Sequence, residues 1–538
     1  MGVPSSPNNS GKKPESNSEL SSSLPSNALF RSSLVVGVMT MLSRVLGLAR
    51  DVVLANFFGA SAGADAFFVA FKIPNFFRRL FAEGAFSQAF IPVLADYKTR
   101  NELEEVRTLL SSVAGVLGFI LFVFTLLAVL GAPWLTALFA PGFVDDPYKY
   151  ALASEMLRIT FPYLMLISLT AFAGAVLNSY GNFSIPAFTP VLLNIVLICA
   201  ALFLAPMFSQ PVVGLAWGVL IAGALQLFFQ FPFLLKMGLL PRLRFDYRHE
   251  GVRRIGRLML PALFGVSVSQ INLLLDTVLA SFLQTGSVSW LYYSDRLVEL
   301  PLGIFGIAIA TVILPNLSAK HASSSTKAFS ATLDWAMRMV VLIGLPAAVA
   351  LLVLAEPLIT TLFHYGALQD RDVVMAAQSL RAYSLGLLAF MLVKVLAPGF
   401  FSRQDMKTPV KIGIIAMVAN MVLNLLLIWP LQHAGLALAT ALSSWLNAAC
   451  LLWVLRKQKV FEAEPGWLLY LCKIGFSIAV MLACLILLND EVSVWFAKDI
   501  WERVLDMLTL VVVGVLSYFI SLLLLRINLR EIVKSKHS

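Results

Sequence analysis

Apolar residues along this chain form long runs that short polar and charged segments interrupt, a pattern typical of membrane-spanning helices. A helix needs about 20 mostly apolar residues to cross the hydrocarbon core of a bilayer, and more if it is tilted. Divided at glycine, proline and charge breaks, the runs predict about fourteen spans. Their approximate ranges are 32–57, 64–96, 104–131, 150–180, 184–206, 211–236, 252–284, 287–318, 326–355, 371–402, 408–430, 432–456, 466–489 and 498–526. We expect kinks or tilts at the prolines within two of the longest runs, which are Pro74, Pro92, Pro301 and Pro315.

The composition supports a protein that lies in lipid. The chain is 59% apolar and 13% charged, whereas soluble globular proteins are about 45–50% apolar and about 25% charged. Its net charge is +10, but the basic residues lie mostly in short loops. The charge therefore indicates topology and contact with membrane lipids rather than a nucleic-acid partner. The sequence predicts an all-α polytopic membrane protein.

Basic residues alternate between the predicted loops, and this alternation orients the chain. Loops 58–63, 207–210 and 285–286 contain no basic residue, whereas the connection 237–253 is rich in arginine. By the positive-inside rule, both termini are predicted to lie in the cytoplasm. Residues 1–27 are rich in Ser, Asn and Pro without an apolar core, so we expect a disordered tail and not a signal peptide.

The chain also repeats itself at a separation of about 223 residues. Asp51–Phe57 resembles Asp276–Phe282, and Leu157–Arg158 resembles Leu380–Arg381. The repeat contains six spans, an even number, so both halves enter the membrane from the same side. The sequence thus predicts two six-helix lobes in a parallel repeat, an architecture of transporters, plus two extra C-terminal helices.

The repeat predicts a division of the chain into six parts. These are a disordered tail (1–30), an N-lobe (31–236), a basic cytoplasmic linker (237–253), a C-lobe (254–459), a C-terminal helix pair (460–528) and a cytoplasmic tail (529–538).

Charged residues inside the predicted spans are the main signal of function, because each costs several kcal/mol unless it faces a cavity or a partner. Basic residues outnumber acidic ones in the first two spans, which contain Arg44, Arg50, Arg78 and Arg79. One interpretation is that ion pairs hold the helices together. The other is a water-filled cavity for an anionic substrate, because guanidinium groups grip phosphate or pyrophosphate with two parallel hydrogen bonds.

Two further features have open interpretations. Gly47, between Arg44 and Arg50, is either a site of close helix packing or a hinge. Asn420 and Asn424 share a helix face, and Asp276 and Thr440 could converge on them. Carboxylate, amide and hydroxyl oxygens suit a hard cation such as Na⁺, but hydrogen bonding between helices would use the same residues.

Catalytic signatures are missing from the sequence, which contains no GxSxG, P-loop, HExxH or CxxC motif. We therefore expect neither an enzyme nor a nucleotide-driven pump, and no cofactor. Membrane potential and an ion gradient, of Na⁺ or H⁺, stay open as sources of energy.

Five segments of the chain carry a recognisable pattern, which is most specific in the first two spans. They are Ser43–Asp51, Asp65–Asn75, Arg78–Phe86, Tyr292–Leu297 and Ser402–Pro409. These segments closely resemble the MurJ (MviN) family of lipid II flippases, within the superfamily of multidrug, oligosaccharidyl-lipid and polysaccharide exporters. The resemblance runs from about residue 30 to the C-terminus.

The resemblance implies a function and its residues. It implies that the chain carries lipid II, the undecaprenyl-pyrophosphate-linked precursor of peptidoglycan, from the cytoplasmic to the periplasmic leaflet of the inner membrane by alternating access. The family's cavity residues match Arg44, Arg50, Asp65, Arg78 and Arg296, to which we add Arg79 from its position near the middle of the span.

The resemblance also implies a groove for the lipid tail at the C-terminal helix pair. It implies a cation site in some relatives at positions that resemble Asp276, Asn420, Asn424 and Thr440. The partners it implies are lipid II, membrane lipids and the machinery of peptidoglycan synthesis, with the monomer as the functional unit. The main alternative is an ion-coupled exporter of the same fold for another polyprenyl-linked glycan or a drug.

Overall fold

The computed structural model describes residues 26–100, 102–303, 313–314, 316–318, 320–321 and 325–527. Within these ranges every regular element is helical, which confirms the predicted all-α class. Residues 1–25, residues 304–312 and Pro315 lie outside the described residues. The tail predicted over 1–30 is wrong at its end, because residues 26–30 belong to the first helix.

The helices follow the predicted apolar runs. The first half of the chain forms α1 (Ser26–Phe58), α2 (Ala62–Arg78), the π-helix η1 (Arg79–Phe86), α3 (Ser87–Arg100), α4 (Leu103–Leu130), α5 (Ala132–Phe139), α6 (Pro147–Thr160), α7 (Tyr163–Ser179), α8 (Ser184–Cys199) and α9 (Pro211–Lys236). The second half forms α10 (Glu250–Ala280), α11 (Ser287–Pro301), α13 (Thr326–Val353), α14 (Ala355–Phe363), α15 (Asp370–Leu396), α16 (Pro398–Phe401) and α17 (Lys407–Lys457). The chain then continues into α18 (Trp467–Leu488), α19 (Val492–Ala497) and α20 (Ile500–Leu524).

Nine of the described helices are long and apolar enough to cross a membrane. One of them is α17, whose 51 residues are interrupted at Gln432 (φ 50°, ψ −129°), the boundary predicted between two spans. The four predicted spans outside this set are 32–57, 64–96, 252–284 and 287–318, and each of them contains at least three charged residues. The fold is therefore consistent with about fourteen spans, and that count stays a prediction.

The second predicted span departs from regular α-helix at a different place from its prolines. Pro74 lies inside α2 and Pro92 inside α3, and neither ends its helix. The change of geometry lies between them, in the π-helix Arg79–Phe86. π-Helical turns are uncommon and occur frequently at functional sites, so this segment draws attention to Arg79.

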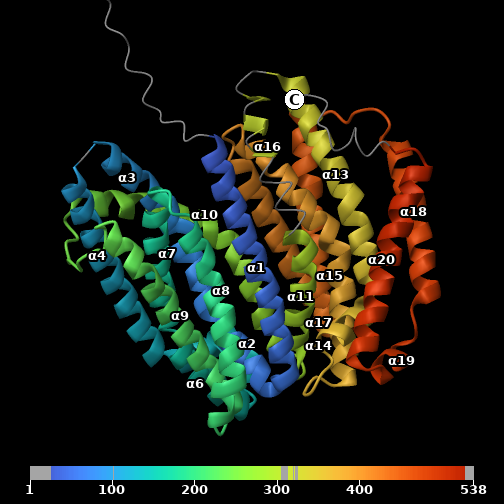
Figure 1. The fold of residues 1–538 in the computed structure, drawn as a ribbon, viewed down its shortest axis with the longest axis horizontal. Coiled ribbons are helices and arrows are strands. Elements are labelled where there is room, and N and C mark those ends of the chain that lie inside the picture. Colours follow the sequence, from blue (N-terminus) through green and yellow to red (C-terminus); the bar gives the residue numbers. More distant parts are fainter. Residues whose placement is uncertain are drawn as a thin grey trace, which may run out of the picture.

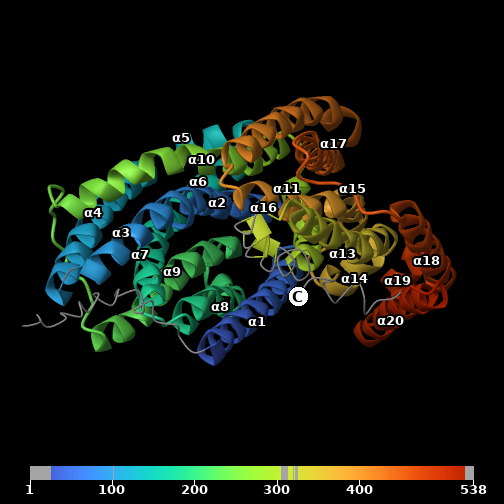
Figure 2. The same cartoon turned by 90° about the horizontal axis from the view of Figure 1, so that it is seen from above.

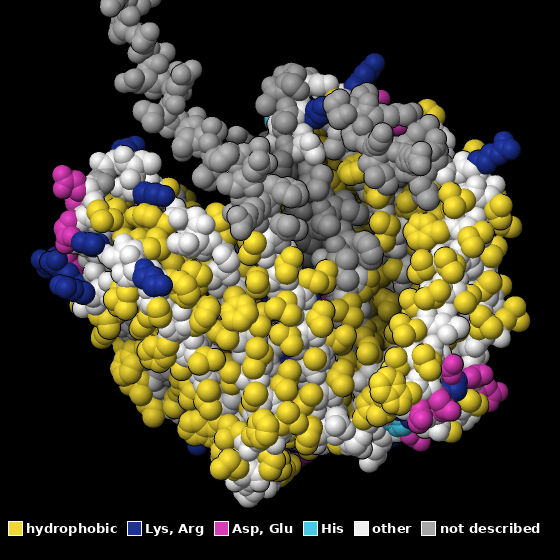
Figure 3. All heavy atoms as spheres, in the orientation of Figure 1, with side chains coloured by type: hydrophobic (Ala, Val, Ile, Leu, Met, Phe, Trp, Pro, Cys, Tyr) yellow, Lys and Arg dark blue, Asp and Glu magenta, His cyan; other side chains and the backbone are white. Residues whose placement is uncertain are grey.

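The repeat is visible in the arrangement of the helices (Figures 1 and 2). Helices α1–α9 form one side of the molecule and α11–α17 the other, with α18–α20 at the outer edge beside α13 and α14. Apolar side chains cover most of the face in Figure 3, and charged side chains gather towards its ends. Such a surface suits a protein surrounded by lipid.

The basic linker packs on the N-lobe. The backbone N–H of Arg244 donates to the Ser111 carbonyl at 3.2 Å, and Arg107 Nε donates to the Gly238 carbonyl at 2.7 Å. Helix α10 begins at Glu250, within the range predicted as linker, and its buried Ile255 joins an apolar cluster of α3, α4 and α7. The first half of α10 therefore belongs to the N-lobe's packing, and the second half contacts α17.

Candidate substrate cavity

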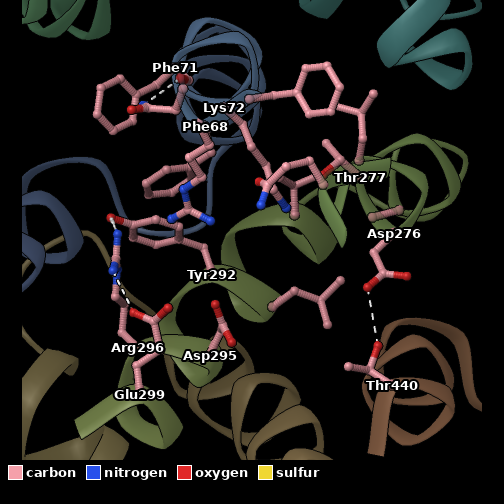
Figure 4. Close-up of a pocket in the computed structure, with 18 of the residues that line it drawn as sticks. Phe68, Phe71, Lys72, Asp276, Thr277, Tyr292, Asp295, Arg296, Glu299 and Thr440 are labelled. Atoms are coloured by element: carbon pink, nitrogen blue, oxygen red, sulfur yellow. Dashed lines mark hydrogen bonds and ion pairs between the residues drawn. The ribbon is translucent and has the colours of Figure 1, made fainter. Parts of the chain in front are cut away.

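A cavity of about 370 Å³ lies between the lobes and is lined by residues of α1, α2, η1, α10, α11, α15 and α17 (Figure 4). Its described charged lining is five cationic and three acidic side chains. They are Arg50, Lys72, Arg78, Arg79 and Arg296, with Asp276, Asp295 and Glu299. Four of the five cations come from the N-lobe, and all three carboxylates come from the C-lobe.

The two lobes meet at a buried network between α1 and α11. Arg50 donates to Asp51 Oδ1 from Nε (2.9 Å) and Nη2 (2.7 Å) and from Nη1 to Asn194 Oδ1 (3.1 Å). From the C-lobe, the Tyr292 hydroxyl donates to Asp51 Oδ1 at 2.9 Å, and Arg296 Nε lies 3.4 Å from Asp51 Oδ2. One buried carboxylate of the N-lobe therefore orients an arginine from each lobe at the cavity wall.

On α11, Arg296 is held by its own helix as well. Its Nη1 lies 2.8 Å from Glu299 Oε2, and its guanidinium stacks over the Tyr292 ring at 5.0 Å. Asp295 is exposed to the cavity, as is Lys72 on the opposite wall (Figure 4). Glu299 lies four residues after Asp295 on the same helix face, and Arg296 supplies a cation beside it.

Arg78 and Arg79 lie where α2 passes into η1. Arg78 Nε donates to Asn75 Oδ1 at 3.1 Å, one turn earlier on the same helix. Both arginines line the cavity, as predicted from their position near the middle of the span. The side chain of Glu83, four residues after Arg79, lies outside the described residues.

Asp65 and Arg44 have other contacts in this conformation. Asp65 accepts hydrogen bonds from the N–H groups of Gly286 (2.7 Å) and Ser289 (3.0 Å) and from the Ser289 hydroxyl (2.6 Å). It thus caps the N-terminus of α11 from the other lobe. Arg44 Nη1 lies 3.5 Å from the Glu299 carbonyl, and its guanidinium packs on Gly303. Neither residue is among the described residues that line the cavity, and their contact with a substrate stays a prediction.

Gly47 lies where α1 passes α8. A Cβ at this position would meet Asn194 Nδ2 at 3.6 Å, an ordinary contact, and α1 is continuous through it. The packing here does not require a glycine. Its role as a hinge stays a prediction.

The polar residues predicted to converge in the C-lobe do so beside the cavity. Asn424 Nδ2 donates to Asp276 Oδ1 (2.9 Å) and to Asn420 Oδ1 (2.6 Å), and the Thr440 hydroxyl donates to Asp276 Oδ2 (3.2 Å). Ser443, which the sequence argument missed, accepts from Asn420 at 3.2 Å. Its spacing three residues after Thr440 was the available signal.

One oxygen of this cluster, Asn424 Oδ1, is buried without a hydrogen-bond partner among the described residues. Buried polar atoms are nearly always paired, so an orphan oxygen beside a carboxylate marks a place that a cation would fit. No group of three His, Cys, Asp or Glu side chains gathers within the described residues. The oxygens that this cluster offers come from a carboxylate, two amides and a hydroxyl.

Loops of the two lobes join at the end of the cavity where α1 ends. Ala367 N–H donates to the Asn56 carbonyl at 2.8 Å, and the Tyr293 hydroxyl donates to the Gly59 carbonyl at 2.9 Å. Gly59 (φ +57°) and Gly366 (φ +58°) lie against backbone of the other lobe, which leaves no room for a Cβ. We call these contacts the loop seal.

Comparison with known proteins is consistent along nearly the whole chain. The family model described as "Lipid II flippase MurJ" matches residues 54–523. A probable lipid II flippase MurJ of Vibrio cholerae is 50% identical over 514 residues, which cover 94% of this chain and 98% of that protein. The lipid II flippase MurJ of Burkholderia cenocepacia is 42% identical over 490 residues, covering 85% and 95% of the two chains.

Comparison with solved structures gives the same family. A structure of lipid II flippase MurJ in an inward closed conformation matches with a TM-score of 0.79 and 27% identity, covering 93% of this chain and 100% of that chain. An inward-facing multidrug transporter of the MATE family matches with a TM-score of 0.66 at 15% identity, covering 79% and 98% of the two chains. The second likeness concerns the fold alone.

Proposed function

The chain belongs to the lipid II flippase MurJ family, and we propose that it moves lipid II from the cytoplasmic to the periplasmic leaflet of the bacterial inner membrane, for peptidoglycan synthesis. This family consists of transporters and not enzymes. The observation that carries the proposal is the cavity between the lobes, in which five cationic side chains meet. It offers what a pyrophosphate-linked headgroup needs within a membrane.

The division of charge across the cavity suggests how the headgroup binds. Arg78, Arg79 and Lys72 stand on the N-lobe wall, opposite Asp295 on the C-lobe wall. A pyrophosphate would bind the N-lobe wall through charge-assisted hydrogen bonds. It would be repelled by the carboxylates opposite, so the headgroup would neutralise one wall and weaken the attraction between the lobes.

Alternating access then requires the loop seal to open. With basic loops in the cytoplasm, as the positive-inside rule indicates, the sealed end faces the periplasm and both termini face the cytoplasm. The headgroup would enter from the cytoplasmic side, and the lobes would rotate as the seal and the Asp65 cap release. Because one chain contains both lobes and the cavity, we expect the monomer to be the functional unit, delivering lipid II to the peptidoglycan synthesis machinery.

We propose that the polyprenyl tail stays in lipid, along the C-terminal helix pair. Helix α18 packs on α20 and α13, and α20 packs on α14. The outer faces of the pair are apolar and exposed, as at Leu468, Leu487 and Leu524. A tail of repeating isoprene units can lie on such a surface without losing its lipid environment.

We further propose that Asp276, Asn420, Asn424 and Thr440 would hold Na⁺ as the coupling ion. A bound cation would supply positive charge beside the Asp276 carboxylate and satisfy the Asn424 oxygen. A binding test needs no transport assay: NaCl should raise the thermal unfolding midpoint of the detergent-solubilised protein relative to KCl at equal ionic strength. Asp276→Asn should remove that difference. An equal response to both salts would contradict the sodium proposal.

The function itself is tested with labelled lipid II in proteoliposomes. Its arrival on the outer face is read with a reagent that cannot cross the bilayer. Transport of lipid II above that of empty liposomes, lost in Arg78→Gln/Arg79→Gln and kept in Arg257→Gln, is the expected result. Arg257 is an exposed arginine of α10 outside the cavity. No transport by the folded protein, or equal transport by both variants, would overturn the proposal.

A further inference from the structure

A second pocket, of about 280 Å³, lies at the end of the C-lobe where α13 begins, near α16 in Figure 1. We call it the C-lobe pocket. It is separate from the central cavity and shares no lining residue with it. The described residues that line it include no acidic one; they are Lys320, His321, Ser325, Thr326, Phe329, Arg403 and Val460.

Arg403 brings a charge into this pocket that its neighbours only partly balance. Its Nη1 donates to the neutral Gln458 Oε1 at 2.8 Å. The nearest carboxylate along the chain, Asp405, accepts the Thr408 N–H at 3.0 Å at the start of α17. Hydrogen bonds from Thr408, first from its side chain and then from its backbone N–H, hold the pKa of Asp405 below its ordinary value, and Arg403 adds a smaller lowering. Asp405 therefore accepts a hydrogen bond at the start of α17 and does not line the pocket.

The N-terminus of α13 adds a second positive element. Its N-cap residue Ser325 makes no side-chain capping bond, and its first turn contains no acidic residue. Lys327 occupies that turn instead. The N–H groups of a 28-residue helix therefore point to the pocket's rim without the carboxylate that usually complements a helix dipole.

The repeat supplies an internal control, because α4 of the N-lobe occupies the position of α13. At the repeat separation of about 223 residues, Glu102 corresponds to Ser325 and Glu104 to Lys327. The N-cap Glu102 is followed by Glu104 and Glu105 in the first turn of α4. The N-lobe therefore provides its own anions at this helix terminus, and the C-lobe does not.

The neighbouring cation differs in the same way. In the N-lobe, Lys98 Nζ donates to the Ser179 carbonyl at 2.7 Å and lies 4.4 Å from the centre of the Tyr180 ring. At the repeat separation, Tyr180 corresponds to Arg403 and Lys98 to His321. Where the N-lobe places a lysine against an electron-rich ring, the C-lobe has His321 and the guanidinium of Arg403. That guanidinium donates to the neutral Gln458, and no acidic side chain is among the described residues that line the pocket.

We propose that the C-lobe pocket binds a phosphate group. The guanidinium of Arg403 presents two parallel donors, and the helix N-terminus and the hydroxyls of Ser325 and Thr326 present others, a set that suits a tetrahedral oxyanion. The phosphate would come from the headgroup of an anionic phospholipid or from a soluble phosphate compound. This site is independent of lipid II transport through the central cavity.

The first arm of the test uses the purified full-length chain in detergent and inorganic phosphate as the probe. Phosphate binding is measured by calorimetry at constant ionic strength, with chloride as the balancing anion because salt screens such sites. Arg403→Gln should weaken one binding phase about tenfold, the loss of one charge-assisted pair. Lys411→Gln, which removes an exposed charge at the same end outside the pocket, should leave both affinity and stoichiometry unchanged. Since the central cavity is also cationic, a second phase that Arg403→Gln does not change is expected.

The second arm distinguishes the source of the phosphate. The same proteins are placed in nanodiscs of phosphatidylcholine with and without phosphatidylglycerol, and retained lipid is counted by native mass spectrometry. A phosphatidylglycerol preference lost in Arg403→Gln and kept in Lys411→Gln assigns the site to lipid. Phosphate binding without that preference assigns it to a soluble ligand. If Arg403→Gln and Lys411→Gln behave alike in both arms while both variants elute as folded monomers, the proposal is wrong.

Discussion

The two lobes repeat the same helices but distribute charge in opposite ways. In the cavity the N-lobe contributes most of the cations and the C-lobe the carboxylates. At the end where α4 and α13 begin, the N-lobe contributes carboxylates and the C-lobe cations. A repeated fold therefore fixes where helices lie and leaves the chemistry of equivalent positions free to diverge.

Asp51 and Asp276 show this divergence most directly, because they stand at equivalent places in the repeat. Asp51 is bound by Arg50 and Arg296. Asp276 is bound by the amide of Asn424 and the hydroxyl of Thr440. Asp51 therefore holds two arginines in place. Asp276 is bound by neutral donors, so its negative charge stays available to a cation.

The largest expected effect comes from neutralising the two carboxylates in turn. Asp51→Asn leaves two guanidinium groups without their shared counter-ion, which should destabilise the fold by about 3 kcal/mol. Asp276→Asn replaces a charge by an amide among amides and should change stability by about 1 kcal/mol or less. Thermal unfolding in detergent measures both. Equal shifts in the unfolding midpoint would show that the two sites do not differ as described.

The second prediction compares the two walls of the cavity. Arg78→Gln/Arg79→Gln removes two charge-assisted contacts of about 1.5 kcal/mol each and should slow lipid II transport about 100-fold. Asp295→Asn, on the opposite wall, should change the rate less than about tenfold, because it removes no contact with an anion. Transport in proteoliposomes, at matched amounts of inserted protein, is the measurement. A larger loss in Asp295→Asn would place substrate recognition on the C-lobe.

Individual residues show which features of the fold and of the cavity could be predicted from the sequence. The spans, the repeat and the place of Arg78 and Arg79 in a cavity followed from hydropathy, spacing and the cost of buried charge, whereas the place of Arg296 followed from the family resemblance. So did the meeting of Asp276 with Asn420 and Asn424. These are properties of single helices or of a repeat, so they can be read along one chain.

Contacts between the lobes could not be predicted in the same way. Nothing local shows that Asp65 caps α11, more than 220 residues later, or that the loop seal needs glycines at 59 and 366. The apolar face of α10 predicts burial but does not say that its first half packs on the N-lobe. The π-helix at Arg79 had no signal in the prolines nearby. Each of these depends on packing between segments that lie far apart in the sequence, which no local pattern records.

The third prediction concerns the contacts that hold the two lobes together. Asp65→Asn keeps the shape of the α11 cap but replaces one of its two accepting oxygens with an NH2 group. At least one of the bonds from Gly286 and Ser289 is therefore lost, at a cost of about 1–2 kcal/mol in the sealed conformation. It should therefore shift the protein towards opening of the loop seal. The thiol introduced by Ser287→Cys, at a fully buried position in the first turn of α11, should react faster with a membrane-impermeant maleimide when Asp65→Asn is also present than when it is not. Faster reaction of a thiol at the opposite end, introduced by Lys411→Cys, would mean general loosening and not release of the seal.

The smallest structural effect is expected from Gly47→Ala. This change distinguishes a role of Gly47 in helix packing from a role as a hinge. The nearest side-chain atom lies 3.6 Å from the place that an alanine methyl group would take, so Gly47→Ala should fit. It should even favour helix by up to about 1 kcal/mol, because glycine is a poor helix former. If α1 bends at this residue during transport, the same change should slow lipid II transport while the unfolding midpoint stays constant or rises. Gly37, on the same helix with nothing within 4 Å, supplies the matched control, Gly37→Ala. Equal transport by both variants would remove the hinge from the mechanism and leave the rotation of the lobes to the loop seal and the Asp65 cap.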